Sequence, residues 1–358
     1  MLRQLARLTV GIPAAGQRAV AVAVYADACD LTIPAADFGY EGVACVDDAA
    51  RALFLFCDLW ERTGVVLFRK WSDALLDFLL YMQRKDGRFV NFVADCDGTR
   101  NETGVTSRAG GDFWQARGVR ALAKAALVLD DGRAGSAFER GLARVREGRD
   151  VPPDVRSIHV LMAIELLRTG RVPDVRADLE RWSEEIAVLR RGDVLLDNPD
   201  QVAPHLWGHQ QEGALALAGA YLERPDLVEI ARRSALAYLA PLIESGFDAP
   251  TVQPYGVAAA IYSVEQLALI TAEPRFADLV LKARGWFDGR NTAGRPVYDR
   301  VVGRVHDGID DGVLNEHSGA ESNIAAAEAL IDEVAANAAR LLPEIEAAMS
   351  AELRTPAA

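Results

Sequence analysis

The residues best suited to chemistry are two adjacent carboxylates in apolar surroundings. Asp47 and Asp48 interrupt an otherwise apolar run over residues 42–57. A buried carboxylate without a partner is costly, so this pair is expected to be either ion-paired or functional. Arg51 follows at the i+3 and i+4 spacings that allow ion pairs along a helix, so a structural role and a catalytic role both stay open.

Three further carboxylates follow glycine-rich segments. Asp112 comes after two glycines, and Glu316 and Glu321 come after a Gly- and Asp-rich loop at 307–312. Asp112 and Glu321 also fit helix capping, and the loop lacks the EF-hand order, so an ordinary exposed acidic loop is expected there. Paired carboxylates across a pocket are the usual equipment of glycosidic cleavage. The predicted catalytic set is Asp47, Asp48, Asp112, Glu316 and Glu321.

Aromatic, basic and imidazole side chains occur near the same segments. Aromatic rings stack on sugar rings and polar groups bond to sugar hydroxyls, although Trp and Tyr are as often core residues. The predicted substrate-binding set is Arg51, Trp114, Arg117, His205, Trp207, His209, Tyr255 and His317. His205 and His209 have a spacing that suits a metal, but the HExxH pattern is absent and no further ligand is evident, so no metal and no cofactor are predicted.

Helical periodicity broken by Gly and Pro dominates the chain. It predicts helices at 13–29, 42–62, 65–84, 111–129, 134–147, 154–169, 175–190, 203–222, 226–244, 254–272, 275–287, 319–336 and 338–353. Short alternating stretches at 88–93 and 296–305 predict hairpins in loops. From residue 42 onward the helices form six pairs, with tight turns inside each pair and longer loops between pairs.

The first helix of most pairs is apolar on nearly every face, as an inner helix is, whereas the second carries a charged face. This pattern predicts an all-α fold, an (α/α)6 toroid over residues 1–358 as one domain, with 1–37 as an extra N-terminal helix or cap. In such a ring the starts of the inner helices, which carry most of the candidate residues, would converge on one cavity. Loops presented by a rigid scaffold often carry function.

The composition excludes several partners. The chain has 39 basic and 52 acidic residues, a net charge of −13 and a sequence pI near 5.0. Nonspecific binding to nucleic acid or anionic membranes needs a basic surface, so neither is expected as a partner. No apolar run is long enough for a membrane span. The four cysteines have no CxxC spacing, so reduced, mostly buried thiols and a cytoplasmic location are expected.

Four motifs together resemble a known family. They are FGYEGVACVDDAARA at 38–52, DGRFVNF at 86–92, GDFWQARGVRAL at 111–122 and NEHSGAES at 315–322. They are similar to segments of an (α/α)6 domain of the six-hairpin glycosidase superfamily, which occurs alone or fused to bacterial and archaeal glycosyltransferases. The resemblance implies the toroid, a carbohydrate context and a possible glycosyltransferase partner. It does not fix the reaction, since fold does not imply function.

The leading hypothesis is a glycoside hydrolase acting on an oligosaccharide or glycoside, with the inverting arrangement favoured. A sugar epimerase or isomerase that uses His205 or His209 as base is the first alternative. A noncatalytic carbohydrate-binding module that partners a glycosyltransferase is the second. No GxGxxG, GxxxxGK[ST] or GxSxG pattern supports a nucleotide-binding fold or an α/β-hydrolase.

Overall fold

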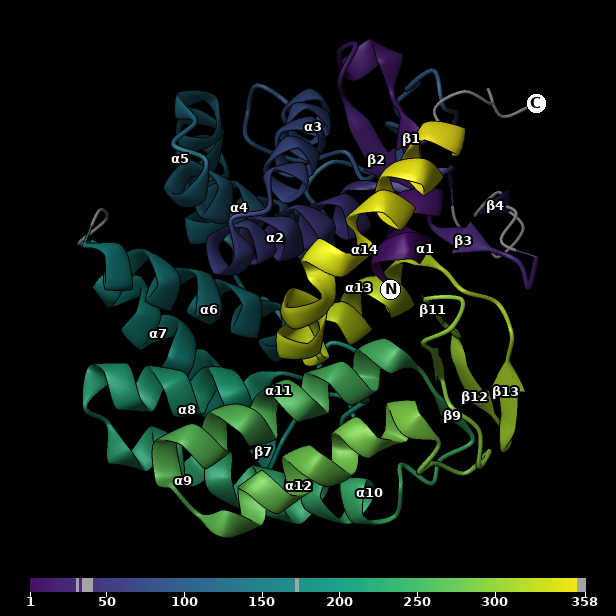
Figure 1. Cartoon of the computed structure of the whole chain (residues 1–358). Helices are drawn as coiled ribbons and strands as arrows, with labels where there is room; N and C mark the ends of the chain where they lie inside the picture. The colour runs from purple at the N-terminus through teal and green to yellow at the C-terminus, as the bar shows by residue number, and fades with distance from the viewer. Residues whose placement is uncertain (30–31, 34–40, 171–173, 353–358) are drawn as a thin grey trace. The chain divides into compact units, whose positions relative to one another are not determined.

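The computed structural model describes residues 1–29, 32–33, 41–170 and 174–352, and it divides into two compact units. Unit 1 comprises Met1–Glu147, Tyr298–Asp307 and Glu316–Ala358, and unit 2 comprises Gly148–Val297 and Gly308–Asn315. Figure 1 follows the chain through both units. Two predicted segments lie partly outside the described residues. They are the predicted cap, at residues 30–31 and 34–37, and the start of the first motif, at 38–40.

Unit 1 is built from helix pairs. Its helices are α1 (Leu2–Arg7), α2 (Val46–Thr63), α3 (Val66–Met82), α4 (Asp112–Val128), α5 (Gly132–Glu147), α13 (Ala320–Ala329) and α14 (Ile331–Glu352). As predicted, α2 packs against α3 and α4 packs against α5, and α2 also lies between α4 and α13. The last helix break falls at Leu330 rather than at residue 337.

The N-terminal segment of unit 1 corrects one prediction. Residues 13–29 form no helix beyond a single 3-10 turn at Pro13–Ala15, and the Ala-Val run continues as strand. The β-branched valines alternate along this run and fit a pleated strand better than a helix. Short strand pairs result: β1 (Thr9–Gly11) with β2 (Val20–Val22), and β3 (Tyr25–Ala26) with β4 (Thr32–Ile33).

Two further strand pairs in unit 1 involve the predicted hairpins. β10 (Tyr298–Asp299) pairs with β11 (Arg304–Val305), which confirms the hairpin at 296–305. The stretch at 88–93 contributes β6 (Phe92–Val93), but its partner is β5 (Ala44–Cys45) rather than a neighbouring segment. This pairing fixes the backbone immediately before α2, the helix that carries Asp47 and Asp48.

Unit 2 is also built from helix pairs, with short strands in its loops. Its helices are α6 (Pro153–Thr169), α7 (Val175–Val188), α8 (Gln211–Leu222), α9 (Pro225–Ser234), α10 (Ala240–Glu244), α11 (Pro254–Thr271) and α12 (Pro274–Arg284). A π-helical turn, Ala235–Leu239, joins α9 to α10, and a 3-10 turn, Gly285–Asp288, follows α12. Its strands are β7 (Arg190–Arg191), β8 (Val194–Leu195), β9 (Thr251–Val252), β12 (Gly308–Asp310) and β13 (Val313–Asn315).

Helix α8 starts later than predicted. It begins at Gln211, whereas the sequence pattern placed a helix from residue 203. Gly208 adopts a positive φ of 71°, a left-handed conformation that favours glycine and cannot continue a right-handed helix. Residues 203–210 therefore form a loop, and this loop carries two of the predicted site histidines, His205 and His209.

Burial follows the predicted distinction between inner and outer helices. α6, α8, α11 and α13 are buried on most faces, whereas α5, α7, α9 and α12 each carry an exposed charged face. The four cysteines are free: Cys45 and Cys57 are buried, Cys96 is partly exposed and Cys29 is exposed. Within the part of the chain that the structure describes, no helix has both the length and the apolar character that a bilayer crossing requires.

Candidate functional site

Five predicted residues of unit 1 meet in one ion-pair network, which we call the Arg51 cluster. Its members are Asp47, Asp48, Arg51, Arg117 and Glu321. Arg51 Nη2 lies 2.6 Å from Asp48 Oδ1 and 3.4 Å from Asp47 Oδ2, and Nη1 lies 2.9 Å from Glu321 Oε1. Arg117 donates to the same Asp47 oxygen from α4. One guanidinium therefore joins carboxylates from α2 and α13.

The start of α2 positions the two aspartates. Cys45 is the N-cap, and its Sγ accepts a hydrogen bond from the Asp48 backbone N–H at 3.4 Å. The Asp47 backbone N–H donates to Asn91 Oδ1 at 3.1 Å, which ties the helix start to the segment leading into β6. Both carboxylates occupy the first helical turn, where the helix dipole favours negative charge.

The two adjacent aspartates experience different environments. The Asp48 side chain is 4% exposed, and its burial raises the pKa to about 7; Arg51 opposes this shift, while the charges of Glu321 and Asp47 add to it. Asp47 is 17% exposed and faces two arginines, and its Oδ1 has no hydrogen-bond partner among the described residues. When the environments of two neighbouring carboxyl groups push their pKa values apart, one group can serve as the acid and the other as the base.

The polar surface of the Arg51 cluster continues along α2, α4 and α13. Glu328 lies two helical turns beyond Glu321, and its side chain is solvent-accessible. The charges of Arg51, Arg120 and Arg117 act on its carboxylate, so Glu328 faces the same basic groups. The sequence analysis missed Glu328, although its i+7 spacing from Glu321 was a signal that both face one side of a helix.

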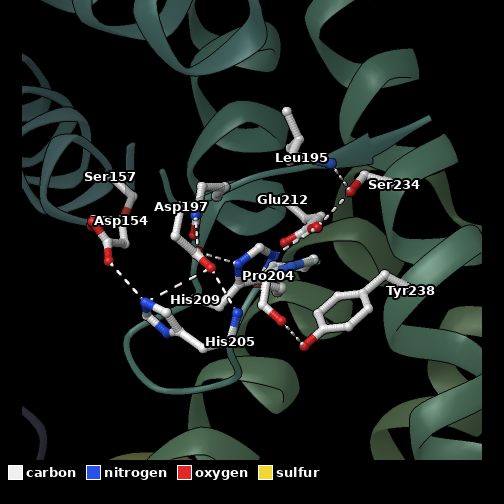
Figure 2. Close-up of polar contacts among 12 residues, drawn as sticks. Asp154, Ser157, Leu195, Asp197, Pro204, His205, His209, Glu212, Ser234 and Tyr238 are labelled. Atoms are coloured by element: carbon white, nitrogen blue, oxygen red, sulfur yellow. Dashed lines mark hydrogen bonds and ion pairs between the residues drawn. The ribbon is translucent and has the colours of Figure 1, made fainter. Parts of the chain in front are cut away.

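Unit 2 contains a second polar network, centred on the fully buried His209. Its Nδ1 lies 2.6 Å from Asp197 Oδ1 and its Nε2 lies 3.0 Å from Glu212 Oε1 (Figure 2). Burial alone would lower the pKa of His209, but the charges of Glu212 and Asp197 raise it to about 10. Ser234 Oγ donates to Glu212 Oε1 at 2.6 Å. His209 is thus a buried cation with both nitrogens committed.

His205 lies at the accessible side of this network. Its side chain is 37% exposed, and its Nε2 lies 3.5 Å from Asp154 Oδ2 and 3.8 Å from Asp197 Oδ2 (Figure 2). Asp154, at the start of α6, is buried, which raises its pKa to about 6. Burial alone would raise the pKa of Asp197. The hydrogen bond from His209 and the charges of both histidines outweigh this effect, so the pKa is lowered overall. We call Asp154, Asp197 and His205 the His205 site.

The remaining predicted residues lie outside both networks. Asp112 is exposed at the first position of α4, and Gly111, not Asp112, is the N-cap. Trp114 covers Gly111 with its ring and donates Nε1–H to the Phe89 carbonyl at 3.2 Å. Four others are not part of the ion pairs and hydrogen bonds that define the two networks above. They are Glu316, which is exposed, and Tyr255, Trp207 and His317, which are half-buried, with Trp207 tilted against the His205 ring at 6.0 Å.

Asp154 and Asp197 were missed by the sequence analysis. Asp154 stands at the start of an inner helix, the position that served to select other candidates, so a signal for it was present. Asp197 lies in the loop after β8 and has no such signal, because its approach to His209 depends on how that loop folds back.

Comparison with known proteins supports the fold. No protein-family model matches the chain, and no curated protein matches it in sequence. Several solved structures share its fold at low identity. A D-mannose isomerase has a TM-score of 0.69 at 11% identity, over 92% of this chain and 96% of that one. The cellobiose 2-epimerase from Spirochaeta thermophila DSM 6192 has a TM-score of 0.65 at 16% identity, over 81% and 87%.

A family 76 glycoside hydrolase from a bovine Bacteroides thetaiotaomicron strain has a TM-score of 0.63 at 10% identity, over 91% of this chain and 75% of that chain. These neighbours are members of the six-hairpin glycosidase superfamily. The chain therefore has the six-hairpin glycosidase fold, and the predicted all-α, (α/α)6 toroid class is confirmed. The neighbours that share this fold include a hydrolase, an isomerase and an epimerase, so the fold does not determine the reaction.

Proposed function

We propose that the chain is a glycoside hydrolase whose reaction takes place at the Arg51 cluster. The observation that supports this most is that Asp47, Asp48 and Glu321 contact a single guanidinium while the two aspartates differ in burial, Asp48 being 4% and Asp47 17% exposed. Hydrolysis of a glycoside needs one carboxyl group that donates a proton and one carboxylate that accepts one or attacks.

Accessibility divides the roles within the cluster. Asp47 and Glu321, at 17% and 27% exposed, are the carboxylates that substrate would contact, whereas Asp48 is 4% exposed and positions Arg51. In the proposed reaction the bond between C1 and the glycosidic oxygen breaks, and that oxygen takes a proton from the acid. Water adds to C1 and gives its proton to the base, directly or after a covalent intermediate.

The first experiment measures hydrolysis with a panel of 4-nitrophenyl glycosides of common hexoses and pentoses. Asp47→Asn and Glu321→Gln are expected to lower kcat/KM at least about 100-fold, in the range of general acid–base effects, with unchanged circular dichroism. The matched control is Asp332→Asn, which removes a 78% exposed carboxylate of the same unit and should keep full activity. Full rates in both cluster variants would contradict the proposal.

A second experiment separates acid from base. A 2,4-dinitrophenyl glycoside has a leaving group that needs no proton, so it restores the rate of a variant lacking the acid. Azide restores the rate of a variant lacking the nucleophile or base. Both reagents are tested on Asp47→Asn and on Glu321→Gln. Each reagent should restore the rate of one variant, and the two reagents should restore different variants. Rescue of neither variant by either reagent would remove both residues from the chemistry.

The alternatives predict different products. An epimerase or isomerase would return the sugar with deuterium from heavy water and without hydrolysis. A binding module would give heat on titration with oligosaccharide and no product. The four free thiols support the predicted cytoplasmic setting, and the glycosyltransferase partner implied by the sequence resemblance stays a prediction for co-purification to test.

A further inference from the structure

Three potential ligand atoms converge in the His205 site. One ligand atom from each of Asp154, Asp197 and His205 lies within 4.8 Å of the other two. The imidazole Nε2 is 3.5 Å from Asp154 Oδ2 and 3.8 Å from Asp197 Oδ2, longer than the 2.7–3.2 Å of ordinary hydrogen bonds. Ligands held at about 2.1 Å from a tetrahedral zinc ion are about 3.4 Å apart. The two distances to the imidazole therefore suit ligands that share one cation better than direct hydrogen bonding.

Asp154 supplies an independent observation. Its side chain is 5% exposed, and its one hydrogen bond within the described chain is from the Val155 backbone N–H to Oδ1, at 2.7 Å. The contact recorded for the other oxygen, Oδ2, among the described residues is the His205 Nε2 atom at 3.5 Å (Figure 2). A buried carboxylate needs compensation of its charge, and the distant imidazole gives Oδ2 only a long contact, so a cation bound between them would compensate it better.

The surrounding residues orient the second carboxylate. Asp197 Oδ1 accepts hydrogen bonds from His209 Nδ1 and from Gln211 Nε2, both at 2.6 Å. Its Oδ2 accepts the His205 backbone N–H at 2.7 Å and stays directed toward the His205 ring. Support of this kind around a ligating carboxylate is typical of metal sites, where it fixes the ligand before the ion arrives.

We infer that Asp154, Asp197 and His205 bind one divalent transition-metal ion of the zinc type. An imidazole nitrogen with two carboxylates suits zinc and its neighbours, whereas magnesium and calcium prefer oxygen ligands alone. Three protein ligands leave a coordination position open, and the 37% exposed His205 side chain puts this site within reach of solvent.

This inference goes beyond the proposed hydrolysis and does not rest on it, since its residues belong to unit 2 and those of the Arg51 cluster to unit 1. It also bears on the epimerase alternative. Nε2 of His205 cannot accept a proton from substrate while its lone pair is bonded to a metal. A direct contact between His205 and Asp154 is the simpler explanation of the site and requires no metal.

The test uses the full chain, stripped with a chelator and then titrated with zinc alone in a calorimeter, with metal content measured after dialysis. One equivalent of zinc is expected, and magnesium is expected to give no heat. Loss of an outer-shell contact alone weakens metal sites by about 10–100-fold, so Asp154→Asn and His205→Gln should each weaken zinc binding at least as much. Cobalt should show the absorption bands of a low-symmetry site in the wild type and not in His205→Gln.

Two controls keep the inference falsifiable. Asp200→Asn removes an exposed aspartate three residues from Asp197, and His306→Gln removes a histidine of unit 1, so both should bind zinc as the wild type does. His205 is in a loop and half-buried, so its variant is expected to fold even if Asp154→Asn does not. Absence of stoichiometric zinc, or equal affinity in wild type and His205→Gln, would overturn the inference, whatever the enzymatic activity.

Discussion

At the scale of single residues, Arg51 is the group on which the unit 1 network depends. Its guanidinium contacts three carboxylates at once, and one of them, Asp48, is nearly inaccessible to water. The planar fork of arginine can serve several oxygens in fixed directions, which the single ammonium of lysine cannot. Removing the arginine would leave a buried carboxylate without its cation.

Arg51→Met is therefore expected to lower the free energy of unfolding by about 3–5 kcal/mol, the usual cost of breaking a buried ion pair from one side. The control is Arg133→Met, whose 55% exposed side chain pairs with Asp131 and Asp77 and whose loss should cost less than about 1 kcal/mol. Urea unfolding at neutral pH measures both. Equal losses in the two variants would show that the Arg51 cluster contributes no more than a surface pair.

His159 should make stability depend on acid pH. It is buried against Trp182, and burial, with the nearby Arg156 charge, lowers its pKa from 6.5 to about 3. Since the folded state resists protonation, the unfolded chain binds more protons between pH 6.5 and 3, and stability falls as the pH falls through this range. Above pH 6.5 the group is neutral in both states and has no effect.

The test compares urea unfolding of the wild type and of His159→Gln at pH 7.5, 6.0 and 5.0. The wild type should lose stability faster than the variant as the pH decreases. Parallel curves would mean that His159 is protonated as readily in the folded protein as in the unfolded chain.

The sequence predicted the residues of the Arg51 cluster because most of their partners are near in the chain or at helix starts. Asp47, Asp48 and Arg51 share one helical turn. It did not predict the His205 site, because two of its three residues follow β8 in irregular backbone whose path no periodicity reveals. There Asp197 reaches His205 only through the fold of the loop.

At the scale of elements, close helix packing in unit 2 depends on small residues. Gly213 in α8 lies so near α11 that an added Cβ would come within 2.9 Å of the Tyr262 ring and 3.0 Å of the Ser263 backbone. Gly135 in α5 has open space at the same position. The two glycines thus offer the same substitution in two helices with opposite surroundings.

Gly135→Ala is expected to raise the free energy of unfolding by about 0.5–1 kcal/mol, because alanine loses less entropy on helix formation. Gly213→Ala is expected to lower it by about 1–3 kcal/mol, the range for overpacking a close-packed interior. Urea unfolding of both variants gives the signs. A gain of stability in both would show that α8 can move away from α11 without cost.

Element prediction succeeded where the periodicity was strong. Helices α2 to α7, α11 and α12 match the predicted segments closely, because Gly and Pro mark their ends. It failed at residues 13–29, where an apolar run carries little periodic information and its valines favour strands. It also failed at 203–210, where the helical spacing of His205 and His209 was coincidental and both residues lie in a loop.

At the scale of the whole molecule, the fold class followed from the alternation of helix types rather than from any single motif. Helices buried on most faces, such as α6 and α8, alternate with helices that expose a charged face, such as α7 and α9. Solved structures share this fold at 10–16% identity. The reaction does not follow from it, because the alternation reports packing and not chemistry.

The net charge of −13 and the pI near 5.0 give a prediction for the chain as a whole. Nucleic-acid binding without sequence preference requires a basic surface that releases counterions, so the protein is expected not to shift duplex DNA at pH 7.5, even at 20 mM salt. At pH 4.5, below the pI, the net charge is positive and weak binding should appear, with circular dichroism verifying that the chain is still folded. Binding at pH 7.5 that weakens steeply with added salt would reveal a basic patch hidden by the average charge, and would contradict the exclusion of nucleic acid as a partner.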